Sequence, residues 1–156
     1  MPSNIERKLV AIMFTDICGY TSHMSADEDV ALSLLDTKLK TLKPLISKNN
    51  GVLVKEMGDG TLSYFNSAEE ATKCSSQLLK VFNKNSSLNV RVGIHYGEIL
   101  LKNNDVFGDV VNIASRLETM SPPGGILISK TMHDNLSASK KYNFISLGLQ
   151  SLKGIG

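Results

Sequence analysis

The sequence predicts an α+β fold, an antiparallel sheet with helices packed on it. Three observations indicate this class. An uninterrupted apolar run near the start is typical of a central strand. Two stretches have apolar residues at the three- and four-residue steps of amphipathic helices, and an Asp-Gly pair between two β-prone runs is typical of a hairpin. Apolar residues make up 42% and charged residues 21%, a globular balance. No Pro/Gly/Ser-rich linker divides the chain, so we expect one domain over residues 1–156.

The chain opens with a predicted strand and a long predicted helix. Residues 9–14 form the apolar run, and residues 15–21 after it are turn-like. Ser25 and Glu28 have the spacing of a capping box. A helix over 26–48 is expected from its apolar stripe, which consists of Ala31, Leu35, Leu39, Leu42 and Ile46.

A predicted hairpin and a second helix follow. Residues 52–55 and 61–65 are β-prone and flank the segment 57–60, whose Asp-Gly pair predicts the turn. Ser67 and Glu70 give a second capping box. The helix that it starts has an apolar stripe of Ala71, Cys74, Leu78 and Phe82.

The remaining elements complete a split βαβ order. Residues 90–94 alternate as a strand, 109–118 are expected to form a helix, and 126–129 and 142–147 are expected to form short strands. The order β-α-β-β-α-β is the ferredoxin-like arrangement, which predicts an antiparallel sheet with helices on one face. The fold names no function. The buried stripe of the third helix is predicted to be Val110, Ile113, Ala114 and Leu117.

Composition argues against several classes of partner. The net charge of +2 comes from scattered lysines without a basic, aromatic-rich patch, so we expect no nucleic-acid polymer as partner. Cys18 and Cys74 have no metal-ligand spacing and are expected to be reduced thiols. The longest apolar run is too short to span a bilayer, and residues 1–8 lack the apolar stretch of a signal peptide. We therefore expect no membrane segment and a cytoplasmic setting.

Two aspartates stand at the ends of predicted strands. Asp16 follows the first strand, and Asp59 lies at the hairpin tip, so both could meet at one sheet edge. A pair of carboxylates suits Mg²⁺, which takes its other ligands from phosphates and water. The alternative is that each aspartate only stabilises a turn. Gly19, Gly58 and Gly60 favour the first interpretation, because glycine lets backbone approach a ligand closely.

Two arginines occupy positions that also suit an anion. Asn112 and Arg116 are spaced i, i+4 and share one helix face. A salt bridge from Arg116 to Glu118 or another surface acid is the alternative. Arg91 alternates with apolar residues on its strand, so it points to the other face of the sheet. Its guanidinium needs an anionic partner, either a carboxylate or a phosphate.

Four blocks together resemble a known family. They are Phe14-Thr-Asp-Ile-Cys-Gly-Tyr-Thr21, Lys55-Glu-Met-Gly-Asp-Gly60, Arg91-Val-Gly-Ile-His95 and Asp105-Val-Phe-Gly-Asp-Val-Val-Asn-Ile-Ala-Ser-Arg116. Each block alone is a weak signal. In this order they resemble the class III adenylyl and guanylyl cyclase catalytic domains, over a region from about Lys8 to the end of the chain.

The resemblance implies a two-metal cyclisation of a nucleoside triphosphate. The ribose 3′-hydroxyl attacks the α-phosphorus and pyrophosphate leaves, with two divalent metal ions, Mg²⁺ or Mn²⁺, as cofactors. Asp16 and Asp59 match the metal-binding aspartates, and the carbonyl of Ile17 matches a further ligand. Backbone amides over 17–21, including those of Gly19, Tyr20 and Thr21, would cradle the triphosphate.

The resemblance also implies which base is read. Lys55 and Asp105 match the purine readers: lysine donates to adenine N1 and aspartate accepts from the 6-amino group. Guanylyl cyclases usually carry Glu and Cys there, so the implied substrate is ATP and the implied product cyclic AMP, a signalling nucleotide. Asn112 matches the residue that orients the ribose and Arg116 the one that stabilises the pentavalent phosphorus. Two further residues match positions that contact phosphates: Arg91 and Lys153.

Family domains build the site between two domains, and this chain carries both halves, so a homodimer is implied. They usually continue with a further strand after the Leu-Lys-Gly stretch, so we expect a last strand cut short and a regulatory domain elsewhere in a larger protein. The alternatives are a guanylyl cyclase and a non-catalytic nucleotide-binding dimerisation domain. A diguanylate cyclase is disfavoured because its Gly-Gly-Asp/Glu-Glu-Phe hairpin is absent.

Overall fold

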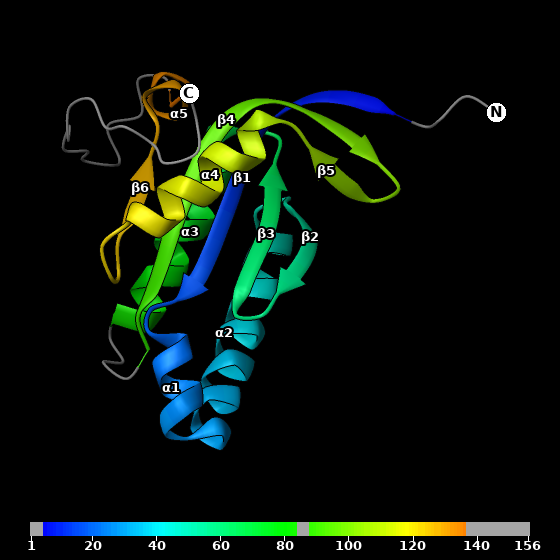
Figure 1. Cartoon of the computed structure of the whole chain (residues 1–156). Helices are drawn as coiled ribbons and strands as arrows, with labels where there is room; N and C mark the ends of the chain where they lie inside the picture. The colour runs from blue at the N-terminus through cyan, green and yellow to red at the C-terminus, as the bar shows by residue number, and fades with distance from the viewer. Residues whose placement is uncertain (1–4, 84–87, 137–156) are drawn as a thin grey trace.

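The computed structural model describes residues 5–83 and 88–136. Figure 1 shows one curved sheet with helices against it. The strands are β1 (Glu6–Ile17), β2 (Val52–Met57), β3 (Gly60–Phe65), β4 (Val90–Lys102), β5 (Asp105–Phe107) and β6 (Ile126–Ile128). The helices are α1 (Tyr20–Ala26), α2 (Glu28–Lys48), α3 (Ala68–Asn83), α4 (Asp109–Met120) and α5 (Lys130–Asp134).

The sheet has the predicted split βαβ topology. Its order is β2-β3-β1-β4-β5, with β6 beside β4. Every neighbouring pair is antiparallel except β4 and β6, which run parallel. The apolar run at 9–14 lies in the central strand β1, where Val10 to Met13 have no exposed surface. The predicted α+β, ferredoxin-like fold is thus confirmed.

The expectation that helices cover one face is wrong. On one face, α2 and α3 pack on β1 through a core that includes Met13, Leu42 and Leu78. On the other face α4 packs on the same strand, in a core that includes Ile12 and Ala114. The physical reason is visible in β1, because consecutive residues of a strand point to opposite faces. A strand that is apolar at every position needs cover on both sides.

The two predicted capping boxes had different outcomes. Ser67 accepts from the backbone N–H of Glu70 at 3.1 Å, so the second cap is confirmed; the Glu70 carboxylate accepts from the Ser67 hydroxyl at 3.0 Å, where a capping box would use the backbone N–H of Ser67. The first is wrong: Ser25 belongs to the short helix α1, and Asp27 caps α2 by accepting from Val30 N at 3.2 Å. Asp27 has extended backbone, which separates α1, a helix that was not predicted, from α2, which matches the helix expected over 26–48.

Other element bounds also differ from the predictions. β4 extends well beyond the predicted 90–94, because it pairs with β1 along its length. The hairpin is confirmed, with Gly58 and Asp59 as its turn; Gly58 has a φ of +60°, which glycine adopts without strain. The predicted strand at 142–147 lies outside the described residues.

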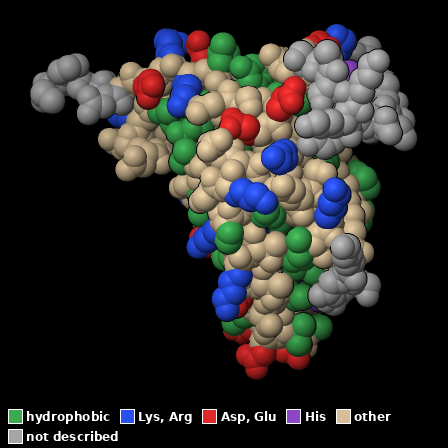
Figure 2. Space-filling model, turned by 180° about the vertical axis from the view of Figure 1, so that it is seen from behind, with side chains coloured by type: hydrophobic (Ala, Val, Ile, Leu, Met, Phe, Trp, Pro, Cys, Tyr) green, Lys and Arg blue, Asp and Glu red, His purple; other side chains and the backbone are tan. Residues whose placement is uncertain are grey.

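The outer face of α2 and α3 carries charges of both signs, with acidic side chains gathered at the start of α2. Figure 2 shows lysine and arginine side chains dispersed over this face. Within the described ranges no helix is long and apolar enough to cross a membrane. What positions the site is the end of the sheet where β1 finishes, the β2–β3 turn lies beside it, and α1 begins (Figure 1).

Candidate active site

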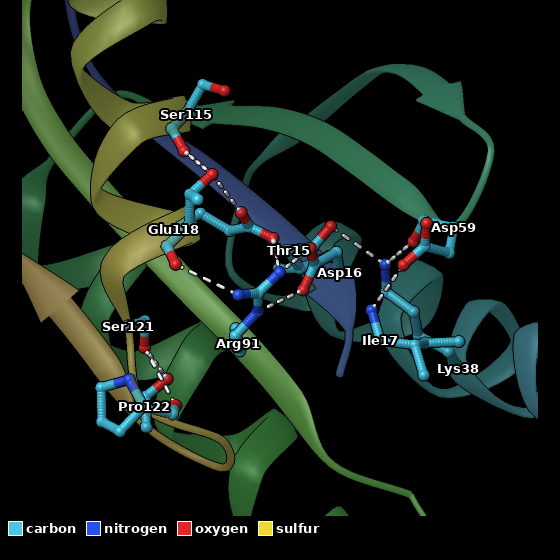
Figure 3. A network of polar contacts seen from close by, with 12 residues as sticks. Thr15, Asp16, Ile17, Lys38, Asp59, Arg91, Ser115, Glu118, Ser121 and Pro122 are labelled. Carbon is cyan, nitrogen blue, oxygen red and sulfur yellow. Dashed lines mark hydrogen bonds and ion pairs between the residues drawn. The ribbon is translucent and has the colours of Figure 1, made fainter. Parts of the chain in front are cut away.

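Asp16 and Asp59 are brought to one hollow by strand pairing. Thr15 of β1 lies opposite Thr61 of β3, so the hairpin turn is beside the end of β1. The backbone N–H of Ile17 donates to Asp59 Oδ2 at 2.9 Å (Figure 3). The hollow, of about 160 Å³, is lined by Asp16, Ile17, Gly19, Tyr20, Thr21, Ser22, Asp59 and Arg91. Seven of the residues singled out from the sequence therefore share this hollow.

Arg91 takes a carboxylate as its partner in this structure. Its Nε donates to Asp16 Oδ1 at 3.0 Å and its Nη2 to Oδ2 at 2.6 Å, a bidentate pair across the β1–β4 ladder. Its Nη1 donates to the carbonyl of Thr119 at 3.1 Å. The hydrogen bonds with Asp16 raise the pKa of Arg91 above its ordinary value. Of the two partners that the sequence allows for Arg91, a carboxylate or a phosphate, this structure shows the carboxylate.

Glu118 was not recognised from the sequence as part of this cluster. It is 7% exposed and lies against Asp16 and Arg91, with Oε1 3.9 Å from Arg91 Nη2. Burial and then a hydrogen bond with Asp16 raise the pKa of Glu118 to about 8. Among the described residues the cation that pairs with Glu118 is Arg91 and not Arg116, so the suggested salt bridge from Arg116 to Glu118 is wrong. The signal in the sequence was its spacing, four residues after Ala114 on the inward stripe.

Lys38 is a second residue that the sequence analysis missed. It lies on the inner side of α2 with no exposed surface. Its Nζ donates to the carbonyl of Thr15 at 3.1 Å, the carbonyl of Asp59 at 2.5 Å and Thr61 Oγ1 at 3.2 Å (Figure 3). Burial lowers the pKa of Lys38 to about 8, against the opposing charges of Asp59 and Asp16. The signal was a lysine on an apolar stripe, seven residues after Ala31 and four before Leu42.

Lys55 and Asp105 form a separate pair that joins β2 to β5, the two end strands in the order of the sheet. Lys55 lies on β2 and Asp105 on β5, and Nζ is 3.2 Å from each carboxylate oxygen. The N–H of Val106 also donates to Asp105 Oδ1 at 2.8 Å, and this bond, with Lys55, lowers the pKa of Asp105. Both side chains are accessible to solvent, so the pair adds little stability and is free to meet a ligand.

Asn112 and Arg116 are both exposed on α4, whose inward side carries Val110, Ala114 and Leu117. These two residues do not line the hollow at Asp16, and Lys55 and Asp105 do not line it either. The residues chosen from the sequence thus divide into two groups within one chain, a hollow group and an outer group. Lys153 lies outside the described residues.

The donors in the hollow suit a hard divalent cation. Over residues 5–83 and 88–136, no three His, Cys, Asp or Glu side chains gather as a metal cage. The hollow offers two carboxylates and the backbone around Ile17, all oxygen ligands. Mg²⁺ and Mn²⁺ accept such sets and complete their shells with phosphate oxygens and water. The residues therefore fit such ions, and their role as ligands stays a prediction.

Comparison with known proteins gives the family. Residues 4–156 match the model of the adenylate and guanylate cyclase catalytic domain. A putative adenylate cyclase 3 of Rhizobium meliloti is 33% identical over 97% of this chain, and a receptor-type guanylate cyclase of Caenorhabditis elegans is 28% identical over 94%. The chain spans 27% and 17% of the lengths of these two relatives.

A solved structure supports the same assignment. An adenylate/guanylate cyclase/hydrolase from Silicibacter pomeroyi superposes with a TM-score of 0.90 at 34% identity, covering 98% of this chain and 94% of that one. The fold is therefore shared along nearly the whole of both chains. This chain belongs to the family of adenylate and guanylate cyclase catalytic domains.

Proposed function

We propose that the chain converts ATP to 3′,5′-cyclic AMP and pyrophosphate, with two divalent metal ions, at sites shared between two copies of itself. The observation that carries the proposal is the division of its polar residues into two groups. One chain holds a hollow with two aspartates and, away from it, the outer group of Lys55, Asp105, Asn112 and Arg116. A two-fold dimer would place the outer group of each copy against the hollow of the other.

The hollow is suited to the triphosphate. Asp16, Asp59 and the carbonyl of Ile17 would hold the two ions, which neutralise the triphosphate and lower the pKa of the ribose 3′-hydroxyl. Gly19 has a φ of +72°, which turns the chain between β1 and α1 and lets backbone amides face the phosphates. Arg91, whose guanidinium pairs with Asp16 here, would be available to bind a phosphate if that carboxylate held a metal ion.

The outer group is suited to the nucleoside and the transition state. Asn112 holds the ribose so that the 3′-oxygen faces the α-phosphorus in line with the leaving group. The new bond forms between this oxygen and phosphorus, the bond to the pyrophosphate oxygen breaks, and the hydroxyl proton passes to water. Arg116 neutralises charge that builds on the phosphorus oxygens.

ATP is favoured by the chemistry of the Lys55–Asp105 pair. Adenine presents an acceptor at N1 and a donor at its 6-amino group, while guanine reverses both. A lysine donor and an aspartate acceptor, already 3.2 Å apart and exposed, complement adenine. The adenylate cyclase name of the Rhizobium relative supports this choice. A guanylyl cyclase is the second candidate, because the Caenorhabditis elegans relative carries that name.

The first experiment incubates the purified chain with Mn²⁺ and either ATP or GTP, and identifies the cyclic product. Cyclic AMP as the main product supports the proposal. Cyclic GMP formed faster than cyclic AMP at equal nucleotide concentrations would favour the guanylyl alternative, and no cyclic product from either nucleotide would refute the proposal.

The second experiment tests the shared site by mixing variants. Asp59→Ala and Arg116→Ala homodimers are each expected to be nearly inactive. In a mixture whose chains exchange, half the dimers are heterodimers with one intact site of two, so about a quarter of wild-type activity should return. The matched control mixes Asp59→Ala with Asp16→Ala, which damages every hollow and should restore nothing. Equal activity in the two mixtures would contradict a site shared between chains.

A further inference from the structure

Lys38 lies beneath the two aspartates, on the face of the sheet covered by α2. Its side chain has no exposed surface, and it comes from the middle of that helix. The ammonium reaches the end of β1 at the carbonyl of Thr15 and the hairpin at the carbonyl of Asp59 and the hydroxyl of Thr61. Figure 3 shows it directed toward the two strand ends from below. One cation therefore contacts both segments that carry the aspartates.

Burying this ammonium costs desolvation free energy, which indicates that its contacts serve a purpose other than packing. An ammonium has three N–H donors, and all three are used here. None of its hydrogen bonds goes to a carboxylate; two go to main-chain carbonyls. A buried charge held this way costs more desolvation than an apolar side chain of the same length would. Packing of α2 on the sheet therefore does not explain a lysine at this position.

The bonds fix the aspartates from outside the hollow, which Lys38 does not line. Thr15 directly precedes Asp16, so holding its carbonyl fixes the backbone from which the Asp16 side chain projects. Asp59 is held at both ends, its carbonyl by Lys38 and its carboxylate by the N–H of Ile17. Loss of the ammonium would leave the hairpin turn held to the end of β1 by the Ile17–Asp59 hydrogen bond and the strand pairing alone.

We propose that Lys38 is a positioning residue, which sets the spacing of the Asp16 and Asp59 carboxylates so that both can hold divalent ions. This inference rests on the proposed function for the role of the two aspartates. The inference predicts the direction in which metal affinity changes when the Lys38 charge is removed. If the nearby positive charge of Lys38 mainly repelled the ions, removing it would tighten metal binding. If Lys38 positions the ligands, removing it weakens metal binding although a repulsive charge has gone.

The test measures Mn²⁺ binding directly, from the electron paramagnetic resonance signal of free Mn²⁺, with the analogue 3′-deoxy-ATP present because it cannot cyclise. Lys38→Met keeps the length of the side chain and removes the donors. The Mn²⁺ dissociation constant is expected to rise about 10- to 100-fold, the range for partners that orient metal ligands. The affinity for 3′-deoxy-ATP at saturating Mn²⁺ should stay within about twofold.

A matched control is Lys40→Met on the same helix, where the lysine is exposed and pairs with Asp36; its Mn²⁺ affinity should equal that of wild type. Thr61→Val removes one acceptor with little change of shape and should weaken Mn²⁺ binding severalfold; it decides the question if Lys38→Met does not fold. Unchanged or tighter Mn²⁺ binding in the folded variants would overturn the inference. A wild-type chain that binds no Mn²⁺ would instead overturn the proposed function.

Discussion

Replacing Gly93 by alanine should force α4 away from the sheet. Gly93 lies on β4 where α4 crosses it. A Cβ added there would lie 2.2 Å from the backbone nitrogen of Glu118, 2.6 Å from the carbonyl oxygen of Ala114 and 2.7 Å from the Cα of Glu118. All three are main-chain atoms, which no rotamer change can move. Against an ordinary contact of about 3.4 Å, the helix must shift by about 1 Å.

The magnitude follows from the kind of overlap. Overpacking a core typically costs about 1–3 kcal/mol, and a rigid backbone on both sides puts Gly93→Ala at about 3 kcal/mol. For a domain of this size such a loss lowers the melting temperature by about 6–12 °C. Because α4 also carries Asn112 and Arg116, the shift should reduce cyclase activity under conditions where the variant is still folded.

The assay is equilibrium unfolding in urea, with Gly97→Ala as the matched control. A Cβ at Gly97 would lie 2.5 Å from Val110 Cγ2, with its next neighbours at 3.7 and 3.8 Å. The overlap is with one side-chain carbon, which a change of the Val110 χ1 rotamer can move, so Gly97→Ala should cost clearly less, and adding Val110→Ala should remove the overlap. A Gly93→Ala cost no larger than that of Gly97→Ala would refute the reasoning.

Three further predictions follow from other contacts. Lys55→Glu with Asp105→Cys should move the ratio of ATP to GTP turnover toward GTP by at least about tenfold, because donor and acceptor at the purine edge are exchanged; an unchanged ratio in an active double variant would mean that other residues read the base. Burial lowers the pKa of His95 from its ordinary 6.5, so the unfolded chain binds more protons at acid pH. The free energy of unfolding should then fall as the pH drops below about 6.5, by at most about 1.4 kcal/mol per pH unit. Urea unfolding at pH 7.5 and 5.5 should show a shallower fall for His95→Gln than for the wild-type chain. Ser67→Ala should lose about 1 kcal/mol by the same assay, since it breaks both bonds with Glu70; a loss no greater than at an exposed site would show that this cap is dispensable.

Local patterns in the sequence were sufficient for most of the elements. The run at 9–14 reflects a strand buried on both faces, the hairpin reflects its Asp-Gly turn, and the stripes of α3 and α4 repeat with the period of a helix that has one buried side. Where two local signals competed, the sequence misled: Ser25 has cap spacing, but Asp27 next to it is the cap. Both residue types can accept from a helix N–H, so only the backbone conformation decides between them.

The sequence by itself determined the order of the elements, the central place of β1 and the aspartates that end up in one hollow. Only the tertiary structure decided that α4 covers the second face, that Arg91 pairs with Asp16, and that Lys38 and Glu118 lie beneath and beside this pair. Arg91 and Asp16 are 75 positions apart, and Lys38 and Asp59 are 21 apart. Helical or strand periodicity reports which side of an element is buried, but not which polar group from another element shares that interior. That choice depends on how the packed helices and the sheet place donors, acceptors and charges within about 3 Å of one another.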